Sequence, residues 1–184
     1  MKSRTRFIIL TALFSSLTAI GAFLRVPLPF IPFTLQTFFC ALSGMILGSK
    51  YGALSQLVYI LIGLAGFPVF TGGGGFTYVL KPSFGYIIGF VLCAYITGRM
   101  TEARKDPKFL YLLFTASAGL LSVYIIGVPY MFAVLNLYLK QGTGVGQIIA
   151  TGFLMTVGGD MLKALLAALI AHRLNPITKK TRLR

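Results

Sequence analysis

The sequence predicts an all-α integral membrane protein, a bundle of six transmembrane helices with the N- and C-termini in the cytoplasm. Hydrophobic residues make up 57% of the 184 residues and charged residues only 11%, too few charges to cover a water-soluble surface. The chain contains six long apolar segments, and nearly all of its 17 lysines and arginines lie outside those segments, in the connections or at the two ends of the chain. No polar linker divides the chain, so residues 1–184 are expected to form a single membrane domain.

Each apolar segment is interpreted as a membrane helix, and in chain order they are 7–24, 35–47, 51–64, 83–98, 109–126 and 147–171. The second and third are shorter than the roughly 20 residues of a straight span, which indicates short, tilted or protein-buried helices. The first has the basic start of a secretory signal peptide. Its apolar run is longer than a signal core, however, and further spans follow it, so it is interpreted as the first helix.

The positive charges predict the orientation by the positive-inside rule. With the N-terminus inside, 13 cations fall on the cytoplasmic side: Lys2, Arg4, Arg6, Lys50, Arg99, Arg104, Lys105, Lys108, Arg173, Lys179, Lys180, Arg182 and Arg184. Three fall on the opposite side: Arg25, Lys81 and Lys140. This asymmetry accounts for the net charge of +14 without any binding of nucleic acid.

The outer loops have an unusual composition for connectors. Residues 26–34 include three prolines, and residues 67–82 include aromatic residues and the glycine run 72–75. Such loops either fold over a cavity in the bundle or serve as flexible connections. The glycine run lacks the Gly-Lys-Ser/Thr ending of a phosphate-binding loop, so no nucleotide site is predicted.

Enzymatic and metal chemistry lack their usual residues. Cys40 and Cys93 lie in apolar segments without metal-site spacing, and they are interpreted as buried packing residues. The sole histidine, His172, lies at the cytoplasmic end of the last segment. The chain is therefore expected not to be an enzyme and to need no metal or other cofactor.

Asp160 and Lys163 are the only charged residues deep inside a predicted span. Three residues apart, they share one face of a helix. Each would cost about 2.5 to 3.5 kcal/mol at the centre of a membrane helix unless it is paired or faces a cavity. The sequence therefore indicates either a ligand site or a structural ion pair.

Further polar groups in or beside the apolar segments are candidate ligand contacts: Thr34, Gln36, Gln56, Tyr59 and Tyr86. Each could instead be satisfied by a neighbouring helix. In the first segment, Ala12 and Ser16 place small residues four positions apart, which favours close packing of another helix, internal or from a partner.

Four motifs occur in the order of a known family: TLQT at 34–37, GFPVF at 66–70, KPSFGYIIGF at 81–90 and GGDMLKA at 158–164. On these motifs the chain resembles the BioY family, the biotin-binding S components of energy-coupling factor (ECF) vitamin transporters. The resemblance covers nearly the whole chain, from the first helix to the last.

The resemblance implies a six-helix bundle in the bacterial plasma membrane that captures biotin from outside. The implied partners are a transmembrane coupling protein and two ATPase subunits. It also implies that Asp160 and Lys163 contact the vitamin and that Ala12 and Ser16 correspond to the family's small-residue motif, with Ser16 replacing an alanine. The glycine run and Lys81 depart from the family pattern, so the loop contacts do not transfer directly.

The chemistry of biotin fits this set of residues. Its ureido ring offers two N–H donors and one carbonyl acceptor, which suit a carboxylate and an ammonium three residues apart. The candidate aromatic walls are Phe70, Phe76, Tyr78 and Tyr86, and Lys81 or Arg25 would attract the ligand carboxylate. The alternatives are an S component for another vitamin and a small ion- or proton-conducting membrane protein.

Overall fold

The computed structural model describes residues 2–182, with side chains described over 4–174. The predicted cytoplasmic cations Lys2, Lys179, Lys180, Arg182 and Arg184 therefore lie outside the described side chains. Over the described range the chain forms six helical rods: α1 (Lys2–Phe23), α2 (Gln36–Leu47), α3 (Ser49–Leu64), α4 (Phe84–Glu102), α5 (Phe109–Ala133) continued by the π-helical turn η2 (Val134–Tyr138), and α6 (Val145–Ile149), η3 (Ala150–Leu154) and α7 (Met155–Arg182) in succession.

Each predicted segment corresponds to one rod, so the helical class is confirmed. Four stretches of helix are long and apolar enough to cross a membrane: Arg4–Phe23, Phe84–Glu102, Phe109–Tyr138 and Val145–Leu174. The helices α2 and α3 have 12 and 16 residues, which agrees with their interpretation as short helices. The described chain is thus a membrane protein with several spans.

The predicted end of the fifth helix, Ile126, was wrong. The sequence Gly127-Val128-Pro129 suggested a break, but the helix continues through Pro129 to Tyr138. A proline is tolerated in a membrane helix because neighbouring helices and local π turns accommodate the lost backbone hydrogen bond. The last rod likewise extends beyond the predicted 147–171 at both ends.

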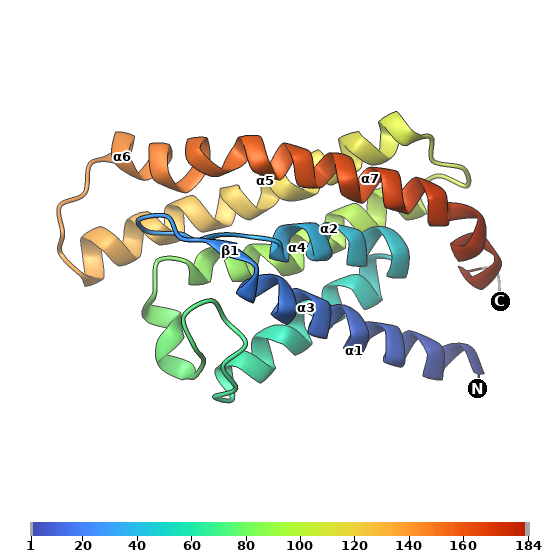
Figure 1. Cartoon of the computed structure of the whole chain (residues 1–184), viewed down its shortest axis with the longest axis horizontal. Helices are drawn as coiled ribbons and strands as arrows, with labels where there is room; N and C mark the ends of the chain where they lie inside the picture. Colours follow the sequence, from blue (N-terminus) through green and yellow to red (C-terminus); the bar gives the residue numbers. More distant parts are fainter. Residues whose placement is uncertain (1, 183–184) are drawn as a thin grey trace.

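The start of α1 and the end of α7 lie at the same end of the bundle, with the α4–α5 connection (Figure 1). The α3–α4 connection, which contains the 3-10 helix η1 (Phe76–Leu80), lies at the opposite end with the α5–α6 connection. A hairpin of two strands with two residues each, β1 (Arg25–Val26) and β2 (Phe33–Thr34), joins α1 to α2. The connections with Lys81 and Lys140 therefore lie at the end opposite the N-terminus.

Close backbone contacts hold α4 against the two short helices. A Cβ added to Gly44 of α2 would overlap the carbonyl oxygen of Ala94 in α4. At the end of α4, the Glu102 carboxylate accepts hydrogen bonds from the Ser49 backbone N–H at 2.9 Å and the Ser49 hydroxyl at 2.8 Å. These bonds satisfy donors at the first turn of α3, which would otherwise lack partners.

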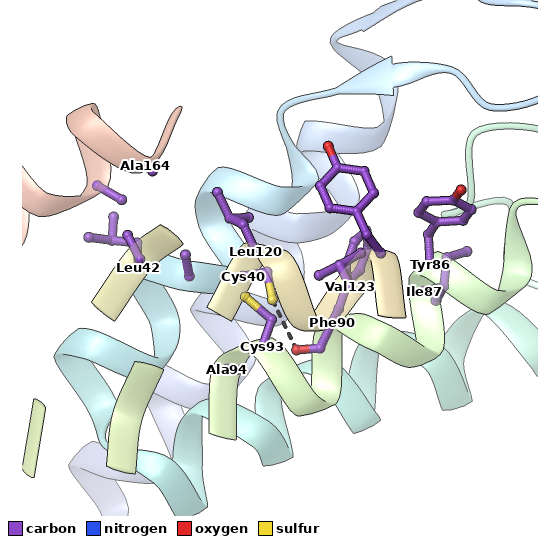
Figure 2. Close-up of a cluster of buried hydrophobic side chains, with 14 of the residues drawn as sticks. Cys40, Leu42, Tyr86, Ile87, Phe90, Cys93, Ala94, Leu120, Val123 and Ala164 are labelled. Carbon is purple, nitrogen blue, oxygen red and sulfur yellow. Dashed lines mark hydrogen bonds between the residues drawn. The ribbon is translucent and has the colours of Figure 1, made fainter. Parts of the chain in front are cut away.

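The core between α2, α4 and α5 is apolar, and both cysteines lie in it (Figure 2). Cys40 and Cys93 are fully buried, which confirms their interpretation as packing residues. The Cys40 thiol donates to the carbonyl oxygen of Phe90 at 3.0 Å. This packed layer forms the floor on which the polar site is built.

Candidate functional site

A cavity of about 510 Å³, its open mouth included, lies among the first outer loop, α2, α4, α5 and α7. Its lining combines apolar and hydroxyl-bearing side chains with one carboxylate and one ammonium: Ile31, Pro32, Phe33, Thr34, Gln36, Thr37, Thr71, Ser83, Tyr86, Ile87, Phe90, Val123, Tyr124, Thr156, Asp160 and Lys163. Figure 2 shows Ile87, Phe90 and Val123, which connect this lining to the core beneath it.

Asp160 lies on α7 with its carboxylate at the cavity wall, and the residue is 5% exposed. Its Oδ1 atom accepts a hydrogen bond from the Thr37 hydroxyl at 3.0 Å and pairs with the Lys163 ammonium. Its Oδ2 atom accepts a hydrogen bond from the Tyr124 hydroxyl. Three elements, α2, α5 and α7, therefore hold this one carboxylate.

Lys163 lies one helical turn after Asp160 and is 4% exposed. Besides pairing with Asp160, its Nζ atom donates to the carbonyl oxygen of Thr34 at 2.7 Å and lies 3.7 Å from the centroid of the Phe33 ring. These contacts connect α7 to residues 31–34, which we call the strap. The lysine thus holds a piece of the first outer loop against the cavity.

Neither charged group uses its whole bonding capacity within the described part of the chain. An ammonium has three donors, and two of them go to Asp160 and Thr34. A carboxylate has about four acceptor positions, and three are occupied. Because both residues line the cavity, a bound molecule could receive one hydrogen bond and donate another without the ion pair being broken.

Glycine at position 159 allows the strap to approach α7. A Cβ added to Gly159 would overlap the Phe33 ring, whereas one added to Gly158 would meet no atom within 4 Å. The close approach sets Phe33 over the Lys163 ammonium, where a cation–π contact is favourable. Of the two glycines before Asp160, only Gly159 is therefore needed for the close approach of the strap.

Gln36 connects the cavity wall to the α3–α4 connection, through Tyr59. Its side-chain oxygen accepts from the Thr34 hydroxyl at 3.1 Å, and its Nε2 donates to the Tyr59 hydroxyl at 2.6 Å. Tyr59 in turn donates to the carbonyl oxygen of Val69 at 3.2 Å. Tyr59 itself does not line the cavity, so it lies one hydrogen bond behind the wall.

Gln56 lies away from the cavity, between α1, α2 and α3. It is fully buried, and its amide is within hydrogen-bond distance of the hydroxyls of Thr18, Ser43 and Ser55, at 3.0 to 3.3 Å. Its geometry is that of a contact between helices.

The outer cations and most of the predicted aromatic walls also lie outside the cavity lining. Lys81 donates to the carbonyl oxygen of Gly72 at 3.0 Å, and Arg25 donates to that of Thr71. Both cations therefore reach the loop whose residue Thr71 lines the cavity. Among the predicted walls, Tyr86 lines the cavity, whereas Phe70 and Tyr78 are buried against each other and Phe76 is 77% exposed.

Sequence reasoning did not identify Tyr124, Thr156 or Phe33 as site residues. A tyrosine in an apolar segment resembles ordinary packing, and its partner Asp160 is 36 positions away in the chain. Thr156 could have been found, because it precedes Asp160 by four residues and so shares its helical face. Phe33 lies in the proline-rich loop that the sequence indicated as a possible cover.

The described residues contain no group of three or more His, Cys, Asp or Glu side chains placed to hold a metal ion. The cavity instead offers separate donors and acceptors around an apolar floor. This chemistry suits an organic molecule with both apolar and hydrogen-bonding parts.

Comparisons with known proteins agree along nearly the whole chain. The model of the BioY family matches residues 1–180. The probable biotin transporter BioY of Lysinibacillus sphaericus is 42% identical over 178 residues, covering 97% of this chain and 91% of the relative. The biotin transporter BioY of Thermotoga maritima is 39% identical over 173 residues, covering 94% and 97%.

Among solved structures, the crystal structure of an S-component for biotin from an ECF-type ABC transporter has the same fold. Its TM-score is 0.82 at 24% identity, and the match covers 95% of this chain and 93% of that one. The arrangement of helices described above is therefore a fold that a solved structure also has.

Proposed function

Because the chain belongs to the BioY family, we propose that it is the biotin-binding S component of an ECF-type transporter and captures biotin from the extracellular side. Relatives that cover more than nine-tenths of this chain are named biotin transporters. The chain is accordingly a transporter subunit and not an enzyme.

The observation that carries the proposal is the position of the Asp160–Lys163 pair at the cavity wall with unused hydrogen-bonding capacity. The carboxylate can accept from a ureido N–H of biotin, and the ammonium can donate to the ureido carbonyl. Charge-assisted bonds of this kind, made away from water, are stronger than neutral ones.

The further ligand contacts in this proposal come from the cavity lining, namely Thr34, Gln36 and Tyr86. Tyr59 supports the site from behind the wall through its bond to Gln36, whereas Gln56 joins α1, α2 and α3. Lys81 and Arg25 attract the ligand carboxylate at the mouth, since they reach the loop that contains Thr71. Among the described residues, the three acids Glu102, Asp106 and Asp160 all lie elsewhere, so this outer rim is positive.

The proposed partners are a transmembrane coupling protein and two ATPase subunits in a bacterial plasma membrane. Ala12 and Ser16 are exposed on α1, where a helix of the coupling protein could pack closely. In this arrangement 1–184 is a single domain with six spans, α2 and α3 included, and both termini face the cytoplasm.

The direct test is mass spectrometry of the small molecules released from the protein purified in detergent from cells grown with a vitamin mixture. We expect biotin at close to one molecule per chain. Recovery of riboflavin or thiamine in place of biotin would reassign the chain to another vitamin. Recovery of no vitamin, together with ion flux in liposomes, would favour a conducting protein.

A further inference from the structure

Tyr124 is a cavity residue that the proposed contacts do not include. It lies on α5, is 6% exposed and contributes to the cavity lining. Its ring meets the Phe153 ring edge to face at 4.9 Å between centroids and the Tyr86 ring at 6.2 Å. The ring is thus fixed on two sides, and its hydroxyl has one well-defined position.

The Tyr124 hydroxyl contacts both Asp160 and Thr156. It donates its single proton to Oδ2 of Asp160, and its oxygen lies 3.0 Å from the Thr156 hydroxyl, which can donate to it. The other carboxylate oxygen, Oδ1, already interacts with Thr37 and Lys163. Tyr124 is therefore the group among the described residues that holds Oδ2.

The terminal torsion of an aspartate is soft, so a carboxylate held at one oxygen can rotate. Rotation of the Asp160 carboxylate toward Lys163 would let both of its oxygens face the ammonium. The free acceptor position of Asp160 and the third N–H donor of Lys163 would then bond to each other and not to a ligand. The Tyr124 bond opposes this rotation, because it holds Oδ2 on the side of α5.

We propose that Tyr124 is a positioning residue that acts on the ligand through Asp160. It keeps the Asp160–Lys163 pair joined through Oδ1 alone, so that Oδ2 and the third ammonium donor remain available to the cavity. The inference deepens the proposed function and rests on it for the identity of the ligand. The effect of Tyr124 on the Asp160 carboxylate does not depend on which ligand binds.

The structural part can be measured without a ligand. Infrared spectra of protein labelled with ¹³C-carboxyl aspartate report only Asp106 and Asp160, and Asp106 is exposed. Tyr124→Phe should shift the Asp160 carboxylate bands toward the two-oxygen pattern. Tyr130→Phe is the matched control on the same helix, because the Tyr130 hydroxyl donates to the carbonyl oxygen of Val79 outside the cavity lining, and it should leave those bands in place. Unchanged bands in Tyr124→Phe would overturn the inference.

The functional part is measured by calorimetric titration of biotin into four proteins: wild type, Tyr124→Phe, Asp160→Asn and the double variant. Tyr124→Phe should raise the Kd at least about tenfold in the wild-type background, as expected for loss of a hydrogen bond to a charged group. In the Asp160→Asn background it should raise the Kd less than about threefold, because coupled residues are not additive.

A full tenfold loss in both backgrounds would contradict the inference, since Tyr124 would then act without Asp160. Absence of biotin binding by the wild type would refute the proposed function instead. The infrared comparison would still decide whether Tyr124 sets the Asp160 carboxylate.

Discussion

At the scale of single residues, the site depends on two buried charges that are paired but not saturated. The pair alone would be a costly way to fasten α7, because taking an ion pair out of water often costs more than its attraction returns. Asp160 and Lys163 also contact Thr37, Tyr124 and Thr34, so their charges are well solvated by the protein before any ligand arrives. A site prepared in this way binds a polar ligand with little reorganisation.

Asp160→Asn and Lys163→Ala are each expected to weaken biotin binding at least tenfold, about 1.4 kcal/mol, while the protein still folds in detergent. Each change removes one charge-assisted bond to the ligand. Calorimetry on the purified variants measures the effect, with Asp106→Asn as the matched control at an exposed position in the α4–α5 connection. Wild-type affinity in both site variants would remove them from the ligand site.

Gln36 and Gln56 are both buried glutamines, but only Gln36 lines the cavity. Gln36→Leu should raise the Kd for biotin roughly tenfold, because Gln36 lines the cavity and orders Thr34 and Tyr59. Gln56→Leu should keep the affinity and lower the thermal stability in detergent by roughly 1 kcal/mol, as its bonds are between helices. If Gln56→Leu alone abolished binding, our placement of the two side chains would be wrong.

The sequence could identify only those site residues that stand out without knowledge of the fold. Asp160 and Lys163 are identifiable because a charge inside an apolar span is rare and costly. Tyr124 is not, since its role arises only when α5 is packed beside α7. Gln36 and Gln56 are alike in sequence, and only the fold places one at the cavity and the other between helices.

At the scale of elements, the strap at 31–34 and helix α7 form one unit. Phe33 packs on Gly159, and the carbonyl oxygen of Thr34 accepts from Lys163. The short lengths of α2 and α3 could be predicted from their apolar runs. The continuation of α5 through Pro129 and the π turn η3 could not be predicted, because both depend on neighbouring helices that compensate for the altered backbone hydrogen bonding.

Gly159→Ala should weaken biotin binding because its Cβ would push Phe33, and with it the strap, away from α7. Gly158→Ala is the matched control, since it makes the same change one residue earlier in open space. Both changes favour the helix by up to about 1 kcal/mol, so a difference in Kd between them reports the strap alone. Equal affinities would mean that the strap does not contribute to the site.

Helix α1 is expected to carry the interaction with the coupling protein. Ala12→Leu or Ser16→Leu should leave the biotin Kd unchanged and reduce co-purification of the coupling protein and ATPases, because a bulky side chain prevents close helix packing. Ile20→Ala on the same helix, also exposed, is the control that adds no bulk. Loss of biotin binding in the leucine variants would instead place this face inside the bundle.

At the scale of the whole molecule, the lysines and arginines of the connections lie at the two ends of the bundle. The connection from α4 to α5 has Arg104, Lys105 and Lys108 and lies with the start of α1, while Lys140 lies at the opposite end. The sequence alone predicted this separation, because topology depends on where charges fall between spans and not on how the spans pack.

The orientation can be tested with single cysteines at exposed connections. On intact cells, a membrane-impermeant maleimide should label Lys140→Cys, and it should label Lys105→Cys only after permeabilisation. The wild type is the control, since Cys40 and Cys93 are fully buried. The opposite labelling pattern would invert the proposed topology.

The most direct measurement is an experimental structure of the protein with biotin bound. We predict the ureido ring in the cavity between the strap and α7, with a ring N–H within 3.2 Å of an Asp160 oxygen and the ring carbonyl within 3.2 Å of Lys163 Nζ, the ordinary limit for such hydrogen bonds. Biotin bound elsewhere, with the Asp160–Lys163 pair making only its contacts to protein, would contradict this account of the site.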